Sequence, residues 1–448
     1  MMNSGVVLWR LVVCAGGLLV GAISPGLAGA EGVQGATSID TSAFALGKAR
    51  LNVIFLESDG SIDINQENWS AEQLTNVHRE IGEATSFWEG LTAGYHPNAQ
   101  LKFDVNYVNG GAPMATGYEP IRRASFQDSF WISEVMADLG YAGNGHFNDV
   151  RAFDHDQRIA GDTHWATTLF VVNDTVDADK RFTNGQFAYG YIGGPYMVLT
   201  YSNFNWGIDR FNRVLSHELA HTFFALDEYQ GAGNRNNEYS GYLNGINGNA
   251  ELNAQGQPVV APQANALMLN NTLDPSPFTD VQVGHRDSDG DSVPDILDTL
   301  PLLSGGEVGS DPLLGLFSFV GSSIVTTIPN LNTNQLGFSS SGAEMTINWI
   351  AGAEYRVNEG AWIGFAAADG AYDEDIEALA LLLPGLPAGE YVIDVRAVNS
   401  VDNASFPMRF AFASALAVPE PGTLGLLGGA VVVVGLVRRL RRIRRGRE

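Results

Sequence analysis

The segment His217-Glu218-x-x-His221 places the strongest constraint on the fold, because its two histidines can bind one metal ion together when the segment is a helix. On a helix, side chains four residues apart leave the same face one turn apart. Two imidazole nitrogens at that spacing hold one Zn²⁺, and Glu218 then lies beside a metal-bound water as its general base. Asp227 supplies a third ligand if the helix stops and the chain folds back. The spacing therefore predicts zinc-dependent hydrolysis.

The alternative is an ordinary amphipathic helix with Leu219, Phe223 and Leu226 facing the core. These apolar residues do follow a helical spacing, but they leave the two histidines unexplained. Neutral imidazole and ionised carboxylate are ligands that zinc accepts, and three protein ligands leave the fourth position open to water. We therefore favour a metal site.

The charge balance limits the partners of the chain. There are 50 acidic and 25 basic residues, so the net charge is -25. Several of the arginines lie in the terminal segments that maturation is expected to remove, which makes the mature body more acidic still. Such a charge argues against nucleic-acid binding and suits a soluble extracellular protein or one that takes up cations.

Residues 1–30 are typical of a secretory signal peptide. Arg10 is the only early charge, an apolar run follows from Leu11 to Ile23, and small residues at 28–30 allow cleavage before Glu31. The apolar run is short for a bilayer span. Cys14, the only cysteine, lies inside this segment. The mature chain is therefore expected to have no disulfide and no thiolate metal ligand.

The C-terminal segment, 418–448, has three parts. Pro419-Glu420-Pro421 precedes an apolar run from Thr423 to Val437, and a basic cluster begins at Arg438. This order resembles the PEP-type C-terminal sorting signal of bacteria that make exopolysaccharide. The resemblance implies a transient transmembrane anchor, cleavage by an exosortase-type enzyme and possible contact with the exopolysaccharide matrix. A plain membrane anchor is the alternative, and in both cases the body of the chain lies outside the cytoplasm.

Residues 45–282 alternate between strand-like and helix-like runs. We expect an α/β or α+β domain with one mixed sheet and a helix that carries the histidines. The expected strands are 51–56, 101–108, 168–173 and 195–201, and the expected helices are 70–91, 130–139, 150–160 and 209–226.

The zinc motif continues in a way that points to a family. His217-Glu218-x-x-His221-x-x-Phe224-x-x-Asp227 resembles the metzincin signature in the snapalysin-type variant whose third ligand is Asp. The resemblance implies an endopeptidase that acts on proteins or peptides, and a Met-containing turn below the metal. Met268 is the candidate for that turn, with ordinary core packing as the alternative. In relatives the substrate pairs with a sheet edge as an added strand. The strand at 195–201 is the candidate for that edge, with an ordinary structural strand as the alternative.

Phe224 departs from the family pattern, which usually has Gly at that position. The chain must turn sharply there, and a left-handed conformation is costly for Phe. Either the turn is built differently or Glu228 replaces Asp227 as the third ligand, and the sequence leaves both open. Tyr229 is a candidate for oxyanion stabilisation, with simple packing as the alternative.

A second metal site is predicted in the acidic linker at 283–300. Carboxylates occupy positions 1, 3, 5, 9 and 12 of a twelve-residue loop, and a backbone carbonyl is free for position 7. This spacing predicts Ca²⁺ binding and resembles a single thrombospondin type 3 repeat, while an acidic linker without metal is the alternative. Ser292 stands where an EF-hand has Gly. The expected ligands are Asp287, Asp289, Asp291, the Val293 carbonyl, Asp295 and Asp298.

Residues 312–415 change to short alternating runs separated by turns, which predicts an immunoglobulin- or fibronectin-like β-sandwich with a spacing or binding role. The expected strands include 346–349, 354–357, 362–365 and 391–397.

Together these features predict a secreted or cell-surface zinc endopeptidase with Glu218 as general base. Two other functions stay open: a surface adhesin or matrix-binding protein with a degenerate peptidase domain, and a zinc hydrolase of non-peptide substrates. The intact Glu218 argues against the adhesin, because a domain that only binds has no use for a general base.

Overall fold

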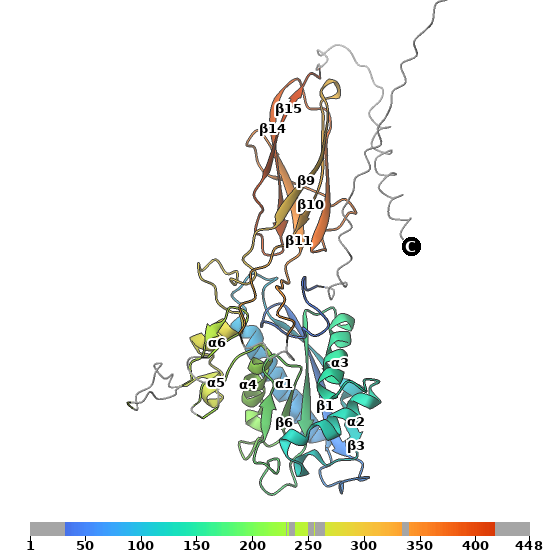
Figure 1. Ribbon diagram of the computed structural model, residues 1–448, viewed down its shortest axis with the longest axis vertical. Coiled ribbons are helices and arrows are strands. Elements are labelled where there is room, and N and C mark those ends of the chain that lie inside the picture. Colours follow the sequence, from blue (N-terminus) through green and yellow to red (C-terminus); the bar gives the residue numbers. More distant parts are fainter. Residues whose placement is uncertain are drawn as a thin grey trace, which may run out of the picture.

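The computed structural model describes residues 32–229, 231–232, 238–249, 255, 265–333 and 340–416. The expected signal peptide (1–30) and the C-terminal segment (418–448) lie outside these residues. Within the described ranges, no helix combines the length and apolar character needed to cross a membrane. The described chain forms an α/β region and a β-rich region stacked end to end (Figure 1).

One mixed sheet organises the α/β region. Its strand order is β2-β1-β4-β6-β5, and β3 pairs with the far end of β1. All pairs are parallel except β5 with β6, so β5 is an antiparallel edge strand. The strands are β1 (Lys48–Ser58), β2 (Lys102–Tyr107), β3 (Met114–Thr116), β4 (Trp165–Val172), β5 (Ala188–Gly190) and β6 (Tyr196–Thr200), with a small hairpin of β7 (Tyr239–Ser240) and β8 (Gly245–Ile246). The helices are α1 (Ala71–Leu91), α2 (Ser129–Asp138), α3 (His146–Ala160), α4 (Phe211–Thr222), α5 (Leu267–Asn270) and α6 (Pro277–Gln282).

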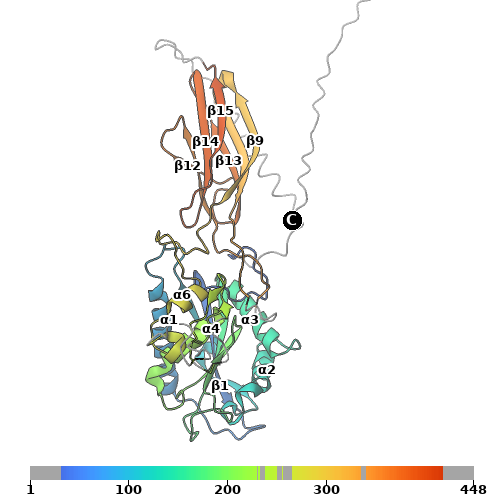
Figure 2. The same ribbon diagram turned by 60° about the vertical axis from the view of Figure 1, so that its left-hand side comes forward.

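Helices cover both faces of this sheet, because alternate side chains along each strand point to opposite faces. Leu51 and Val53 of β1 enter the core shared with α1 and α4. Ile54 and Leu56 enter a second core shared with α2 and α3. Figure 2 shows α1 on one side of the sheet and α2 and α3 on the other. The expected layered α/β architecture with one mixed sheet is confirmed.

Two expected elements in this region were wrong in detail. The strand expected at 195–201 is present as β6, but it lies between β4 and β5, so it is an ordinary interior strand and not the substrate-binding edge. The edge strand next to β6 is β5, which is only three residues long and too short to leave a sequence period. The helix expected at 209–226 is α4, which ends at Thr222.

The β-rich region consists of two antiparallel sheets, with strand orders β13-β10-β9 and β12-β11-β14-β15. Phe317, Phe319 and Leu379 of the first sheet pack against Ile393 and Val395 of the second. The strands are β9 (Leu302–Asp311), β10 (Leu316–Ile324), β11 (Ile350–Val357), β12 (Ile363–Phe365), β13 (Ile376–Leu383), β14 (Gly389–Asn399) and β15 (Met408–Ser414).

The expected boundary of the sandwich at 312 leaves out its first strand, β9, whose side chains are largely exposed and show little hydrophobic alternation. The strand expected at 346–349 joins neither sheet. Thr346 instead forms an isolated bridge with Gln34, and the Asn348 side chain donates to the Leu297 carbonyl (2.8 Å). Both partners lie far away in the sequence, which is why the local pattern was misleading.

The two regions share one continuous core at their junction. Phe44, Ile296, Met345 and Val401 belong to the same cluster of buried side chains. Tyr242 links them further, since its hydroxyl donates to the Ile328 carbonyl (2.9 Å) and accepts from the Met345 N–H (2.8 Å). The linker at 283–300 therefore lies at a packed joint.

Candidate active site

Helix α4 carries the histidines and is held at both ends. Its Asn212 N–H donates to the buried Glu80 carboxylate of α1 (3.1 Å), and the Trp88 indole donates to the Ser216 carbonyl (3.2 Å). At the other end, Ser42 donates to the Thr222 carbonyl (2.6 Å). Contacts from α1 and from the N-terminal segment thus fix the helix in position.

The structure brings His217, Glu218 and His221 together. One ligand atom of each lies within 4.8 Å of the others, and all three residues are buried. The Nδ1 atom of His217 lies 3.0 Å from the Leu267 carbonyl, and that of His221 lies 2.8 Å from the Ala225 carbonyl. Because a carbonyl only accepts, both Nδ1 atoms donate, and Nε2 is the nitrogen of each ring that is left to bind a cation.

Phe224 makes the turn that brings in the third group. It takes the left-handed conformation, with φ of 71°, even though it is not Gly. Its side chain is buried, and its carbonyl accepts from Ser240 (2.6 Å), so packing and hydrogen bonding offset the backbone strain. After this turn, Asp227 Oδ1 lies 3.0 Å from His217 Nε2 and 3.4 Å from His221 Nε2.

Glu228, the alternative third ligand, points elsewhere. Its carboxylate accepts from Thr279 (2.8 Å) and from Ser276 at the start of α6, and its N–H donates to the Met268 carbonyl (2.9 Å). Of the two alternatives, only Asp227 faces both histidines.

Met268 lies in α5, fully buried in the core that includes α4. The carbonyls of Leu267 and Met268 hold His217 and Glu228, respectively. The Leu267 carbonyl of this segment therefore contacts His217 directly, while the Met268 side chain packs in the core.

The charges of the cluster are strongly coupled. Burial lowers the pKa of His221, but the Asp227 carboxylate outweighs burial and raises it to about 9. Burial acts to raise the pKa of Asp227, and the two histidines overcome it, so the net direction is downward. Burial raises the pKa of Glu218 above its usual range. Glu218 is thus a stronger base than an exposed carboxylate.

Tyr229 is partly exposed beside this cluster. Burial raises the pKa of its hydroxyl, and Asp227, to which that hydroxyl is hydrogen-bonded, raises it further. Tyr229 therefore stays a protonated donor at the edge of the site.

Sequence reasoning missed the groups that orient the site. Asn247 donates to the Asp227 carbonyl (2.9 Å). The orienting carbonyls of Ala225 and Leu267 have no sequence signal, because every residue carries a carbonyl. Gly190 of β5 was also missed: a Cβ there would lie 3.1 Å from Glu218 Oε2.

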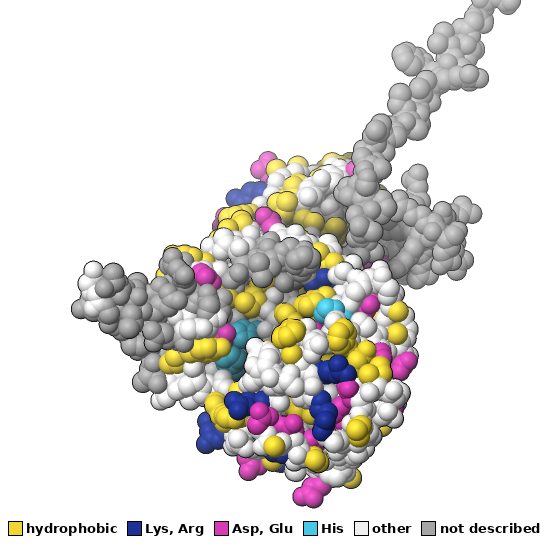
Figure 3. Space-filling view, turned by 60° about the horizontal axis from the view of Figure 1, so that its bottom comes forward, with side chains coloured by type: hydrophobic (Ala, Val, Ile, Leu, Met, Phe, Trp, Pro, Cys, Tyr) yellow, Lys and Arg dark blue, Asp and Glu magenta, His cyan; other side chains and the backbone are white. Residues whose placement is uncertain are grey.

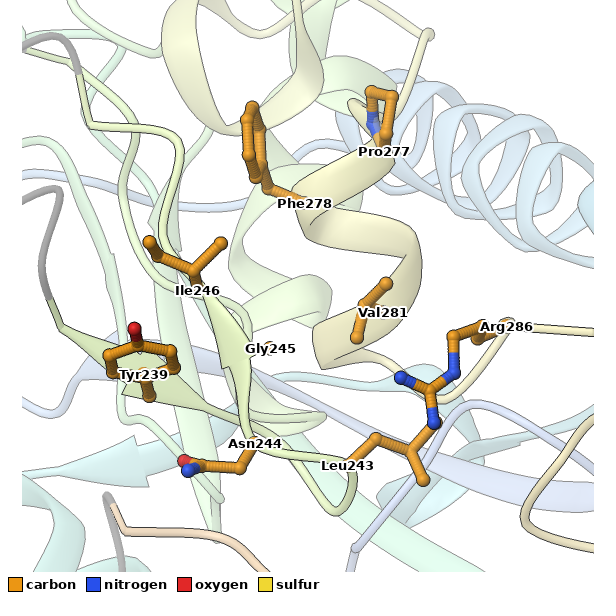
Figure 4. A pocket seen from close by; sticks show the side chains of 9 residues that line it. All are labelled: Tyr239, Leu243, Asn244, Gly245, Ile246, Pro277, Phe278, Val281 and Arg286. Carbon is orange, nitrogen blue, oxygen red and sulfur yellow. The ribbon is translucent and has the colours of Figure 1, made fainter. Parts of the chain in front are cut away.

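A groove of about 320 Å³ lies between the β7–β8 hairpin and α6 (Figure 4). Leu243, Ile246, Phe278 and Val281 make its walls mainly apolar. Arg286 stands at one end, paired with Asp295 (2.6 Å). None of the candidate zinc ligands lines this groove.

The acidic loop is only partly assembled. Carboxylate oxygens of Asp287, Asp289 and Asp291 lie within 4.8 Å of one another. Ser292, at the position where an EF-hand has Gly, takes φ of 76°. Two of the other expected ligands have different partners: Asp295 binds Arg286 and Ser288, and Asp298 accepts from Asn403 (2.8 Å). Val293, whose carbonyl is the remaining expected ligand, is buried.

The surface around the α/β end mixes charged and apolar groups. Figure 3 shows acidic and basic side chains interspersed with hydrophobic ones, with histidine side chains visible on this face. Within the described ranges, the two clusters above are the groups of three or more acidic or histidine side chains that are close enough to share an ion.

Comparison with known proteins identifies the C-terminal segment. Residues 417–442 match the PEP-CTERM protein-sorting motif. None of the curated proteins matches the chain. The motif establishes an exported protein with a C-terminal sorting signal and membrane anchor, destined for the cell surface or the outside of the cell. Its processing enzyme is of the exosortase type.

Some solved structures show remote likeness. Wild-type OgpA from Akkermansia muciniphila is 9% identical, covers 84% of this chain and 95% of its own, and has a TM-score of 0.27. Catalytically inactive OgpA in complex with an O-glycopeptide covers the same shares at 9% identity, with a TM-score of 0.25. The PKD domain of an M14-like peptidase from a Thermoplasmatales archaeon covers 26% of this chain and 92% of its own, at 13% identity and a TM-score of 0.15. Likenesses at this level place the chain in no family.

Proposed function

We propose that this protein is a zinc-dependent endopeptidase that acts outside the cytoplasm. The observation that carries the proposal is the convergence of His217 Nε2, His221 Nε2 and Asp227 Oδ1, with contacts of 3.0 and 3.4 Å, beside the buried Glu218. These donors fit zinc, because both imidazoles are held in the tautomer that frees Nε2 and the third donor is a carboxylate. Three protein ligands leave a position for water or substrate.

The bound ion would supply Lewis acidity that polarises a peptide carbonyl and acidifies water. Glu218 would accept the proton from that water and return it to the leaving amine. Its raised pKa suits this role, because a stronger base accepts a proton more readily. Tyr229, still protonated, would donate a hydrogen bond toward developing negative charge.

The edge strand β5 would bind the substrate. Among the described strands, β5 pairs only with β6, and its Gly190 lies against Glu218. An extended peptide that adds to this free edge would bring its backbone past Glu218. The resemblance to metzincins, in the variant with Asp as third ligand, supports this mode of binding.

Metal content and cleavage test this function together. The purified full chain is expected to hold about one zinc per molecule and to cleave casein or a peptide library, with activity lost on chelation. Glu218→Gln is the matched control: it leaves the ligands in place, so zinc should remain while kcat falls by roughly 100- to 10,000-fold. Zinc without cleavage of any peptide would favour an adhesin or a non-peptide hydrolase. Absence of zinc after mild purification would overturn the proposal.

We also propose that the loop at 287–298 binds Ca²⁺. Three carboxylates within 4.8 Å, two of them exposed, repel one another, and a cation would relieve that repulsion. Asp295 and Asp298 would join as ligands only by leaving Arg286 and Asn403. Calorimetric titration of the chelated protein with Ca²⁺ should show binding, and no heat at millimolar Ca²⁺ would contradict it.

The β-rich region is proposed to be an immunoglobulin- or fibronectin-like accessory domain. Consecutive strands cross between its two sheets from β10 to β11, from β12 to β13 and from β13 to β14. Its last strand, β15, ends at the tip remote from the α/β region (Figure 1). The sorting motif follows there, so the sandwich would space the candidate active site from the membrane and contact the exopolysaccharide matrix.

A further inference from the structure

Edge strand β5 is too short to be rigid by strand pairing alone. It forms three residue pairs with β6, of Ala188, Tyr189 and Gly190 with Leu199, Val198 and Met197. Short edge pairings are weak in water. Alternation along the strand places Gly190 on the face of α4, and Tyr189 and Tyr191 on the opposite face with α2 and α3.

On the first face, β5 lies in direct contact with Glu218, the proposed general base. A Cβ at Gly190 would lie 2.8 Å from the Glu218 carbonyl oxygen and 3.1 Å from Oε2. The Gly190 N–H is hydrogen-bonded to the Glu218 carboxylate. The following turn also reaches α4, since the Gly193 N–H donates to the His221 carbonyl (2.8 Å). The position of this short segment therefore sets the surroundings of Glu218.

On the opposite face, one carboxylate oxygen gathers three phenols. Asp128 Oδ2 accepts from Tyr196 (2.7 Å), Tyr189 (3.1 Å) and Tyr191 (3.2 Å). Tyr189 lies in β5, Tyr191 follows it, and Tyr196 is buried in the interior strand β6. Asp128 precedes α2 and is itself buried. A single residue thus ties the edge strand, its turn and its neighbouring strand to one helix.

The Asp128 carboxylate does not cap its own helix. It occupies the N-cap position of α2, where Asp normally accepts from the helix N–H groups, but makes no such bond. His146 Nε2 lies 3.8 Å from its other oxygen. Phe147 packs on Tyr191 and Tyr196, with ring centroids 4.5 and 5.1 Å away. Aromatic packing by Phe147 therefore stabilises this cluster. We call the cluster the tyrosine clamp; its members are Asp128, Tyr189, Tyr191 and Tyr196.

We propose that Asp128 is a positioning residue for the candidate active site: through the tyrosine clamp it holds β5 against Glu218. This inference rests on the proposed peptidase function for its kinetic consequence. Its structural part, the fixing of β5, does not depend on catalysis.

The test combines hydrogen exchange with kinetics on the full chain. In Asp128→Asn, the amide oxygen cannot hold three phenols and the charge is lost. We expect exchange in the segment 186–194 to rise about tenfold while α4 stays protected. Zinc content should remain, and kcat should fall by about 10- to 100-fold, more than KM rises, because Glu218 is misplaced.

Tyr141→Phe is the matched control, since it removes a phenol–carboxylate bond to Asp156 (2.8 Å) near the same core without touching β5. It should change neither exchange in 186–194 nor kcat. Tyr189→Phe keeps Asp128 but removes one of its three phenol hydrogen bonds. It should therefore show the effects of Asp128→Asn at roughly a fifth of their size. This variant provides the test if Asp128→Asn fails to fold. Unchanged exchange in 186–194, uniform loss of protection across the domain, or unchanged kcat overturns the proposal. A wild-type chain that cleaves nothing refutes the peptidase function instead, and exchange alone then decides whether the clamp fixes β5.

Discussion

The carboxylates of the candidate active site and those of the loop at 287–298 are held in place by different kinds of contact. Asp227 and Glu228 are held by groups from α4, α6 and the loop at Asn247. Asp287, Asp289 and Asp291 lie in one short loop, where they accept hydrogen bonds from its backbone. Burial makes the first set depend on tertiary contacts, and exposure leaves the second set governed by local spacing and solvent. Changes to the buried set should therefore have larger effects.

The largest effect is expected at Asp227. Asp227→Asn keeps the shape but removes the charge that faces both histidines, so zinc affinity should fall by more than about 100-fold. Titration against a chromophoric chelator measures this. Glu228→Gln is the control and should keep zinc affinity within about tenfold. If Glu228→Gln lost more zinc affinity than Asp227→Asn, Glu228 and not Asp227 would be the third ligand.

Substitutions at Phe224 compare the backbone strain of the buried turn with the packing energy of the Phe224 ring. Phe224→Gly relieves a positive φ but removes a buried ring, and the loss of packing should dominate, lowering the free energy of unfolding by about 2 kcal/mol. Phe224→Ala loses the ring and keeps the strain, so it should be less stable than Phe224→Gly by about 1 kcal/mol. Denaturant unfolding compares all three. A Gly variant more stable than the wild type would mean that strain outweighs packing.

The buried carboxyl group of Asp154 is expected to make the stability of the α/β region depend on pH. It is fully buried against Asn52 and Thr168, and burial raises its pKa to about 8. The folded state therefore keeps a proton that the unfolded chain loses near pH 4. Its contribution to stability is complete below pH 4 and is lost as the pH rises toward 8, at up to about 1.4 kcal/mol per pH unit.

The opposite trend of His164, whose pKa burial lowers to about 4, makes a difference measurement necessary. Denaturant unfolding of wild type and Asp154→Asn between pH 4 and 8 cancels the His164 contribution. The free energy of unfolding of the wild type, minus that of Asp154→Asn, should fall as the pH rises from 4 to 8. A constant difference would show that Asp154 ionises at the same pH in both states.

The smallest effect is expected in the exposed loop. With Ca²⁺ present, Asp291→Asn should lower the thermal midpoint by roughly 2–4 °C, because a ligand is lost. With chelator, the same variant should match or exceed the wild type, since repulsion with Asp287 and Asp289 is reduced. Scanning calorimetry in both buffers measures the pair. Equal thermal midpoints of the wild type and the variant in Ca²⁺ would contradict Ca²⁺ binding by this loop.

Much of the layered fold follows from local periods. Residues 51–56 lie in strand β1, and helix α1 begins directly after Ser70, as the sequence predicts. Strand β9 and edge strand β5 were missed because exposed or very short strands carry little hydrophobic period. The N-terminal segment around Phe44 was not expected in the core either, since nothing local marks its contacts with α4 and Tyr242.

By itself, the sequence determined that His217 and His221 share a helix face with Glu218 beside them, and that the chain carries a PEP-CTERM sorting signal. Both depend only on spacing along the chain. Only the tertiary structure decided that Asp227, not Glu228, faces the histidines. It also decided that backbone carbonyls select their tautomers and that β5 lies against Glu218. These outcomes depend on where the backbone turns at Phe224 and on groups as far as 50 residues away, which no local period encodes.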